Sequence, residues 1–167
     1  MLIQSPLIEK IFPPMPKFFA LIPAAGSGSR MGGELPKQYL PLAGRPLLYH
    51  ALAPLCRHAG IERVFVVLAP GDKEFSRRDW QPFAAKLTPL YCGGETRAAS
   101  VFNGLLAARD EIGAADWVLV HDAVRPCLAQ AVLERLMAGL RDEESGGLLA
   151  LPVVDTLKRG DADAYVM

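Results

Sequence analysis

Several features are scarce in this chain of 167 residues, and each scarcity excludes a class of protein. The chain has no net charge, because Lys and Arg together number 18 and Asp and Glu together also number 18. No overall field therefore attracts it to nucleic acid or to an anionic membrane surface, and we expect neither as a partner. No apolar run approaches the roughly 20 residues that a membrane-spanning helix needs. We therefore expect a cytoplasmic protein.

Cysteine is also sparse. Cys56, Cys92 and Cys127 are odd in number, widely spaced and not arranged in CxxC pairs, a pattern that favours neither a disulfide framework nor a zinc site. We predict that they are reduced thiols in the core. Residues 1–15 lack the basic start, long apolar centre and cleavage site of a secretory signal. Because prolines also oppose regular structure there, we predict that these residues form a disordered extension.

Short apolar runs alternate with longer amphipathic ones in residues 16–167, which we expect to form one domain. Strands are predicted at residues 18–22, 63–69, 87–92, 117–120 and 148–153, and helices at 46–58, after Thr96, and at 129–141. The inward stripe of the middle helix is predicted to be Ala98, Val101, Leu105 and Ala108. This alternation implies an α/β fold, a Rossmann-like, doubly wound and mostly parallel sheet with helices on both faces.

The unusual residues follow the predicted strands, where the ligands of such sheets bind. A small, glycine-rich loop at residues 24–33 can bring backbone amides close to an anion. Its glycine spacing is not GxGxxG and no Gly-Lys-Ser/Thr follows, so neither the dinucleotide-binding nor the P-loop interpretation applies. Arg30 and Lys37 supply the two cations that a polyphosphate needs. We predict a triphosphate site, the alternative being a flexible turn beside two solvated charges.

Five sequence blocks in order carry a more specific signal. They are PAAGSGSRM (23–31), PKQYL (36–40), GGETRAASV (93–101), VHDAVRP (120–126) and PVVDTLK (152–158). The first block alone is shared with many sugar-nucleotide pyrophosphorylases. Together the five resemble the 2-C-methyl-D-erythritol 4-phosphate cytidylyltransferase family over residues 18–158, so that residues 16–167 are interpreted as a nucleotide-binding α/β domain of the nucleotidyltransferase type.

The resemblance implies a reaction. The family transfers a cytidylyl group from CTP to 2-C-methyl-D-erythritol 4-phosphate, with magnesium and release of pyrophosphate, in the non-mevalonate route to isoprenoid precursors. Arg30 and Lys37 would be the catalytic residues, stabilising charge on the triphosphate while a phosphate oxygen attacks the α-phosphorus. That nucleophile is already anionic at neutral pH, so positioning and electrostatics can suffice without a general base. Two alternatives stay open: another CTP- or UTP-dependent transferase acting on a sugar or polyol phosphate, and a non-catalytic binding module.

The resemblance also implies roles for single residues. The nucleotide-binding set would be Ala24, Ala25, Gly26, Ser27, Gly28, Gly94, Glu95, Ser100 and Ala123, and the substrate-binding set Asp122, Arg125 and Thr156. The family usually has Asp where this chain has Glu95. Asp122 is expected to contact the second substrate, the alternatives being a magnesium ligand and a cap on the following loop. His121 and Arg97 are expected to support the loops.

The family continues beyond Met167, through an arm that pairs two subunits into a homodimer and through further residues that position the second substrate. The resemblance thus implies that this chain lacks the family's C-terminal part and its dimer arm. We expect an exposed apolar face or an unpaired sheet edge as a consequence. We also expect nucleotide affinity with poor turnover.

Overall fold

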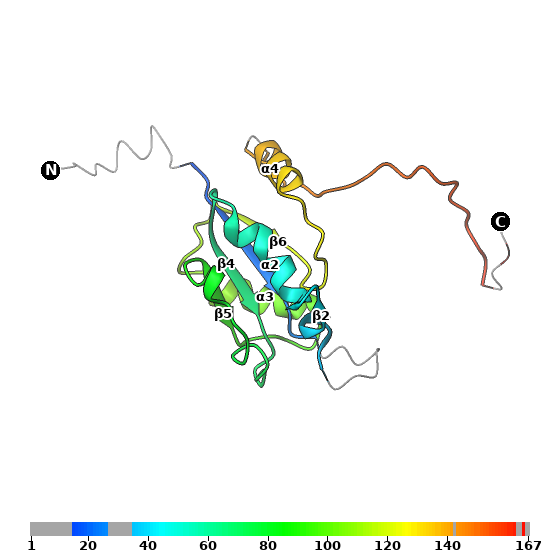
Figure 1. The fold of residues 1–167 in the computed structure, drawn as a ribbon. Coiled ribbons are helices and arrows are strands. Elements are labelled where there is room, and N and C mark those ends of the chain that lie inside the picture. Colours follow the sequence, from blue (N-terminus) through cyan, green and yellow to red (C-terminus); the bar gives the residue numbers. More distant parts are fainter. Residues whose placement is uncertain (1–14, 27–34, 142, 163–164, 166–167) are drawn as a thin grey trace.

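A four-stranded parallel sheet forms the centre of the fold (Figure 1). A computed structural model describes residues 15–26, 35–141, 143–162 and 165. The sheet has the order β5-β4-β1-β6, and a separate two-stranded sheet is formed by β2 and β3. The strands are β1 (Phe18–Pro23), β2 (Pro41–Leu42), β3 (Arg45–Pro46), β4 (Ile61–Val67), β5 (Leu87–Leu90) and β6 (Trp117–Val120). The helices are η2 (Lys37–Tyr39), α2 (Leu47–Arg57), η3 (Gln81–Phe83), α3 (Arg97–Ala107) and α4 (Gln130–Gly139).

The sheet is covered on both faces, which confirms the predicted fold class. In β1 the side chains of Ala20 and Ile22 join one hydrophobic cluster with residues of α2 and α4, while Phe19 joins a second cluster with Phe65 and Ala108 at the end of α3. This division follows from the period of two in a strand, which sends successive side chains to opposite faces. Each central strand is therefore apolar at nearly every position, as a parallel sheet buried on both faces requires.

Helix α3 begins as its sequence predicts, but its inward stripe is a different one. The side chain of Thr96 accepts a hydrogen bond from the amide of Ala99 at 3.0 Å, which confirms the predicted cap. The predicted stripe was correct at Ala108 but wrong at Ala98 and Leu105, which are exposed. The buried positions within the helix are Ser100 and Gly104. A Cβ atom at Gly104 would lie only 2.5 Å from Cγ2 of Val67. The helix sits so close to the sheet that small residues fit against it, and larger ones turn outward, with Phe102 66% exposed.

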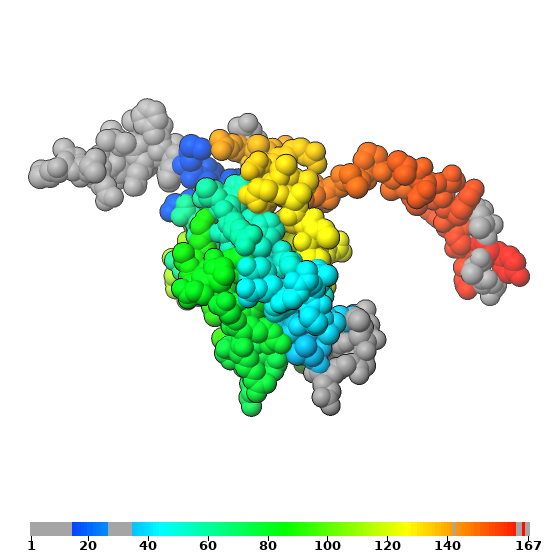
Figure 2. Space-filling view, in the orientation of Figure 1, coloured from blue at the N-terminus to red at the C-terminus, as the bar shows by residue number. Residues whose placement is uncertain are grey.

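The segment after α4 does not form the predicted fifth strand. Residues 148–153 contain no strand, and Leu151 and Val154 are 88% and 94% exposed. Figures 1 and 2 show this segment running away from the packed body of the protein. The apolar pattern resembles that of a strand, but a strand also needs a hydrogen-bonding neighbour. The prediction over residues 148–153 was therefore wrong.

Strand β6 lies at an edge of the sheet. Within the described part of the chain it pairs with β1 on one side, and Val120 is 41% exposed. The expected open edge is thus present, together with exposed apolar side chains on α3 and after α4. None of the described helices is long and apolar enough to cross a membrane.

The three cysteines are free thiols, as predicted, but they do not share one environment. Cys56 is buried, Cys92 is half-buried and Cys127 is exposed. Burial raises the pKa of the Cys56 thiol to about 12. The prediction of three core thiols was wrong for Cys127, which is exposed in an irregular segment before α4. Residues 1–14 of the predicted N-terminal extension lie outside the described residues.

Candidate functional site

The order of the strands places the candidate site. The chain moves outward from β1 through β4 to β5, then returns to add β6 on the other side of β1. In such sheets ligands bind beyond the carboxyl ends of the strands at the point where the order reverses. Here that point lies between β1 and β6, so that residues 24–26 and residues 121–126 follow neighbouring parallel strands at the same edge of the sheet.

The loop after β1 lies directly against the loop after β5. The amide of Ala24 donates to the carbonyl of Val67 at 2.7 Å, and the amide of Gly93 donates to the carbonyl of Leu68 at 2.8 Å. A Cβ atom at Gly93 would overlap the Cβ of Ala25 and lie 2.8 Å from the oxygen of Leu68. Only glycine permits this approach, which brings the first and third sequence blocks into contact.

Gly94 and Ser100 form the next part of the site. The Ser100 hydroxyl accepts from the amide of Gly94 at 3.1 Å and lies 3.3 Å from its carbonyl oxygen, and Ser100 is only 3% exposed. A Cβ at Gly94 would come within 2.6 Å of the Cβ of Ala99. These contacts fix a short turn at the N-terminus of α3, beside which Glu95 is exposed. The Gly94 amide is already bound to Ser100, so the turn is held in place by contacts within the protein.

Asn103 belongs to this region although the sequence analysis missed it. Its side-chain amide donates to the carbonyl of Cys92 at 2.8 Å, so that α3 is tied to the loop after β5 from a second position. The available signal was an Asn seven residues after the helix cap, where an amide can reach the preceding loop. Asn103 supports the turn rather than lining it.

Asp122 is held between two arginines at the end of β6. Its Oδ1 lies 2.8 Å from Nη2 of Arg97, and its Oδ2 lies 2.8 Å from Nε of Arg125. Partial burial raises the pKa of this carboxyl, but the hydrogen bond from Arg97 and the charges of Arg97 and Arg125 outweigh it and lower the pKa below its ordinary value. Asp122 is therefore a carboxylate at neutral pH. His121 supports the loop through a 3.0 Å contact with the carbonyl of Arg125.

Lys37 begins the short helix η2, which lies near the end of β1. The side chain of Gln38 donates to the carbonyl of Ala24 at 2.7 Å, which ties η2 to the first loop of the site. The hydroxyl of Tyr39 donates to Oδ2 of Asp72 at 2.7 Å. The contact of Gln38 with Ala24 places Lys37 near Ala24 and Ala25, and their role in binding phosphate stays a prediction. Gln38 and Asp72 were not predicted, although Gln38 lies within a quoted sequence block.

The remaining predicted residues divide into three groups. Ala123 is buried beside Asp122, and Gly26 is exposed at the end of the first loop. Ser27, Gly28 and Arg30 lie outside the described residues. Thr156 is exposed in the segment after α4 and has no hydrogen bond to another described residue, so its role stays a prediction.

A groove leads away from the charged end of the site. It has a volume of about 340 Å³, begins beside Arg97, Asp122 and Arg125, and continues along the open edge of β6. Leucines of α4 and Leu148 line its apolar part. The polar end can receive an anion or a hydroxyl group, while the apolar part extends along the exposed edge described above.

A metal ion would find few protein ligands here. Among the described residues, no group of three His, Cys, Asp or Glu side chains could hold one. Asp122 is the carboxylate that borders the groove, and both of its oxygens are paired with guanidinium groups. This donor set fits a magnesium ion that takes most of its ligands from phosphate oxygens and water, because magnesium in nucleotide sites commonly uses only one or two carboxylates.

Comparisons with known proteins agree with this geometry. The family model described as IspD, 2-C-methyl-D-erythritol 4-phosphate cytidylyltransferase, matches residues 18–167. The 2-C-methyl-D-erythritol 4-phosphate cytidylyltransferase of Nitrosospira multiformis is 61% identical over 149 residues, which are 88% of this chain and 64% of that protein. The enzyme of the same name from Azoarcus sp. is 58% identical over 151 residues, covering 90% of this chain and 64% of that protein.

Solved structures give the same result. A 4-diphosphocytidyl-2C-methyl-D-erythritol synthase superposes with a TM-score of 0.77 at 34% identity, covering 91% of this chain and 68% of that one. The 2-C-methyl-D-erythritol 4-phosphate cytidylyltransferase of Francisella tularensis superposes with a TM-score of 0.69 at 30% identity, covering 90% and 64%. The chain spans 64% of the length of the first two curated relatives.

Proposed function

The chain belongs to the 2-C-methyl-D-erythritol 4-phosphate cytidylyltransferase family, and we propose that it binds CTP and serves transfer of the cytidylyl group to 2-C-methyl-D-erythritol 4-phosphate. The observation that carries this proposal is the close approach of Gly93 to Ala25. It joins the loop after β1, which is small enough to admit phosphates, to the turn at Gly94 and Ser100, which is shaped for a base.

The charge on the triphosphate is met by Lys37 and, by the family resemblance, by Arg30. An oxygen of the second substrate's phosphate attacks the α-phosphorus, a new P–O bond forms, and the bond from the α-phosphorus to the bridging oxygen of the β-phosphate breaks. Pyrophosphate leaves with that electron pair. Because the attacking oxygen carries negative charge from the start, no proton has to be removed, and cations that stabilise the spreading charge lower the barrier.

The second substrate is proposed to bind at Asp122 and Arg125. The lowered pKa keeps Asp122 ionised, so it accepts hydrogen bonds from hydroxyl groups of ribose or of the polyol. Arg125 is 75% exposed at its side chain and retains donors for a phosphate while it pairs with Asp122. A bound magnesium ion would supply further positive charge to the phosphates, and Asp122 is the described residue that would contact it. We propose a cytoplasmic location, which the free thiols fit.

Thermal unfolding in the presence of each of the four nucleoside triphosphates with magnesium tests the nucleotide assignment. A ligand at 100 times its dissociation constant adds about 2.7 kcal/mol to the free energy of unfolding. CTP is expected to raise the melting temperature most, because a small pocket with fixed amide partners rejects purines by size and uracil by its hydrogen-bond pattern. Stabilisation by UTP instead would favour a related transferase, and stabilisation by ATP or GTP alone would overturn the proposal.

Release of pyrophosphate tests the reaction itself. We expect release to require both CTP and 2-C-methyl-D-erythritol 4-phosphate, and replacement of the second substrate by ribitol phosphate to lower the rate. Since Thr156 is exposed in the segment after α4 and has no hydrogen bond to another described residue, we expect the second substrate to bind more weakly than CTP. Release that occurs equally without any polyol phosphate would contradict cytidylyl transfer.

A further inference from the structure

The two residues that follow Lys37 are buried and are both hydrogen-bonded to other parts of the protein. Gln38 is 5% exposed and Tyr39 is 2% exposed. Gln38 binds the carbonyl of Ala24, in the loop after β1, whereas Tyr39 binds the carboxylate of Asp72, in the loop after β4. The short helix η2 is therefore fastened at adjacent positions to two loops that belong to neighbouring strands.

Asp72 is itself held in one orientation. Its Oδ1 accepts from the backbone amides of Glu74 at 2.8 Å and Phe75 at 2.9 Å. The other oxygen, Oδ2, accepts from Tyr39 at 2.7 Å. A carboxylate with three such donors cannot rotate without breaking at least one hydrogen bond, so it presents a fixed acceptor to the Tyr39 hydroxyl.

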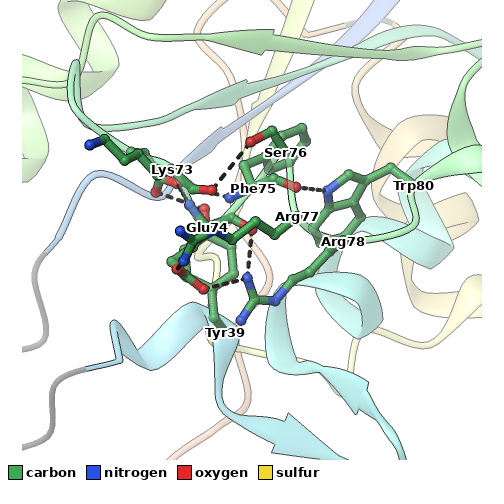
Figure 3. Close-up of polar contacts among 9 residues, drawn as sticks. Tyr39, Lys73, Glu74, Phe75, Ser76, Arg77, Arg78 and Trp80 are labelled. Carbon is green, nitrogen blue, oxygen red and sulfur yellow. Dashed lines mark hydrogen bonds and ion pairs between the residues drawn. The ribbon is translucent and has the colours of Figure 1, made fainter.

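The residues that follow Asp72 also contact one another, and one of them covers a face of the Tyr39 ring. The guanidinium carbon of Arg78 lies 4.4 Å from the centre of that ring, and Nη1 of Arg78 pairs with Glu74 at 2.8 Å. Figure 3 shows Tyr39 beneath Arg78, with Glu74 and Trp80 in the same cluster. Trp80 donates to the carbonyl of Phe75 at 2.7 Å and stacks on its ring. Tyr39 is thus held on its face as well as at its hydroxyl.

The Tyr39 hydroxyl remains a donor over the whole working range of pH. Burial, and then the hydrogen bond and negative charge of Asp72, raise the pKa of Tyr39 far above its ordinary value. In contrast, Lys37 itself forms no ion pair or hydrogen bond through its side chain within the described residues. The backbone that carries Lys37 is fixed while its ammonium group is left available.

We propose that Gln38 and Tyr39 are positioning residues that hold Lys37 beside the phosphates of the nucleotide. The inference rests on the proposed CTP site and deepens it. Lysine has a long, flexible side chain, and binding has to restrict it. A backbone that is already fixed leaves less freedom to lose on binding, so the contact of Lys37 with phosphate is stronger. The hydrogen bond of Tyr39 to Asp72, 33 residues away, acts on affinity only through Lys37.

The test compares four proteins: the wild type, Tyr39→Phe, Lys37→Ala and the double variant. Tyr39→Phe removes the hydroxyl and keeps the ring under Arg78. Magnesium-CTP is titrated into each protein by calorimetry, and exchange of the Tyr39 and Leu40 amides, which donate to Pro36 and Lys37, is followed in parallel. Tyr49→Phe is the matched control, because the Tyr49 hydroxyl has only an exposed contact with Arg57 at 3.5 Å.

We expect Tyr39→Phe to weaken CTP binding about three- to tenfold, the usual effect of one net hydrogen bond, and to speed exchange of both amides. Tyr49→Phe should do neither. In the Lys37→Ala background the Tyr39 substitution should have little further effect. An unchanged affinity in Tyr39→Phe, or an equal loss in both backgrounds, would overturn the positioning role. Failure of the wild type to bind CTP would instead reject the proposed function on which it rests.

Discussion

Arg97 and Asp122 are joined by a double contact, with Nη2 at 2.8 Å and Nε at 3.0 Å from the same carboxylate oxygen. The two residues are 25 positions apart and belong to different parts of the fold, the first turn of α3 and the loop after β6. Their contact connects the N-terminus of α3 to the loop after β6, and both residues border the groove. The pair therefore bears on both stability and binding.

The pH dependence of stability follows from this pair. The pKa of Asp122 is lower in the folded protein than in the unfolded chain, so its stabilising contribution is present above the unfolded value of about 4 and is lost as pH falls through the folded value. Urea unfolding of the wild type and Asp122→Asn should differ most at neutral pH. The difference should shrink as pH falls below about 4. A difference that grows on acidification would contradict the ion pairs.

Substitution of Gly93 tests the contact between the loop after β1 and the loop after β5. A Cβ at this position would overlap Ala25, so Gly93→Ala should push the loops apart and destabilise the fold by about 1 to 3 kcal/mol. CTP affinity should fall as well. Gly71→Ala is the control, because no atom lies within 4 Å of a Cβ placed there. Urea unfolding measures the first effect and calorimetry the second, and equal behaviour of the two variants would contradict the close approach.

The close packing of α3 on the sheet predicts that replacing a glycine of this helix by alanine lowers stability, the opposite of what helix propensity predicts. Alanine is a better helix former than glycine by about 1 kcal/mol, but a Cβ at Gly104 would lie 2.5 Å from Val67 and 2.9 Å from Leu21. Gly104→Ala should therefore destabilise the protein by about 1 to 3 kcal/mol. Gly139→Ala, at the end of α4 with nothing within 4 Å, should be neutral or stabilising. Chemical denaturation separates the two, and stabilisation by Gly104→Ala would show that α3 lies farther from the sheet.

Removal of the N-terminal cap of α3 should lower the stability of the protein by a smaller amount. Thr96→Ala removes the acceptor for the Ala99 amide and should cost about 1 kcal/mol, measured as a lower midpoint of thermal unfolding. Thr156→Ala is the matched control, since Thr156 is exposed and makes no hydrogen bond to a described residue. If both substitutions left the midpoint unchanged, the cap would contribute nothing measurable.

The features that were predicted well from the sequence are those that depend on residues close together in the chain. The apolar run of β1, the cap at Thr96 and the limits of β6 all depend on neighbouring residues, and each is found as predicted. Strand β4 spans Ile61–Val67, two residues earlier at both ends than the predicted 63–69, because its pairing with β1 runs from Ile61 to Val67. The alternation of strands and helices predicted the parallel sheet, but the strand order β5-β4-β1-β6 was not predicted.

The features that sequence did not predict depend on distance in space. The stripe of α3 was misassigned because the periodicity of apolar residues does not reveal how closely a helix approaches a sheet. The partnership of Tyr39 with Asp72 joins residues 33 positions apart, and no local pattern marks it. The run at residues 148–153 has the composition of a strand, but its conformation depends on a pairing partner rather than on its own residues.

Calorimetric titration of magnesium-CTP into the wild type and Lys37→Ala tests the central claim most directly. The wild type should bind one CTP per chain, and loss of the Lys37 charge should weaken binding by about 10- to 100-fold, as expected for hydrogen bonds between charged groups. Lys17→Ala, at the opposite end of β1, should leave the dissociation constant unchanged. Equal binding by all three proteins, or no binding by the wild type, would contradict a nucleotide site at the carboxyl ends of these strands.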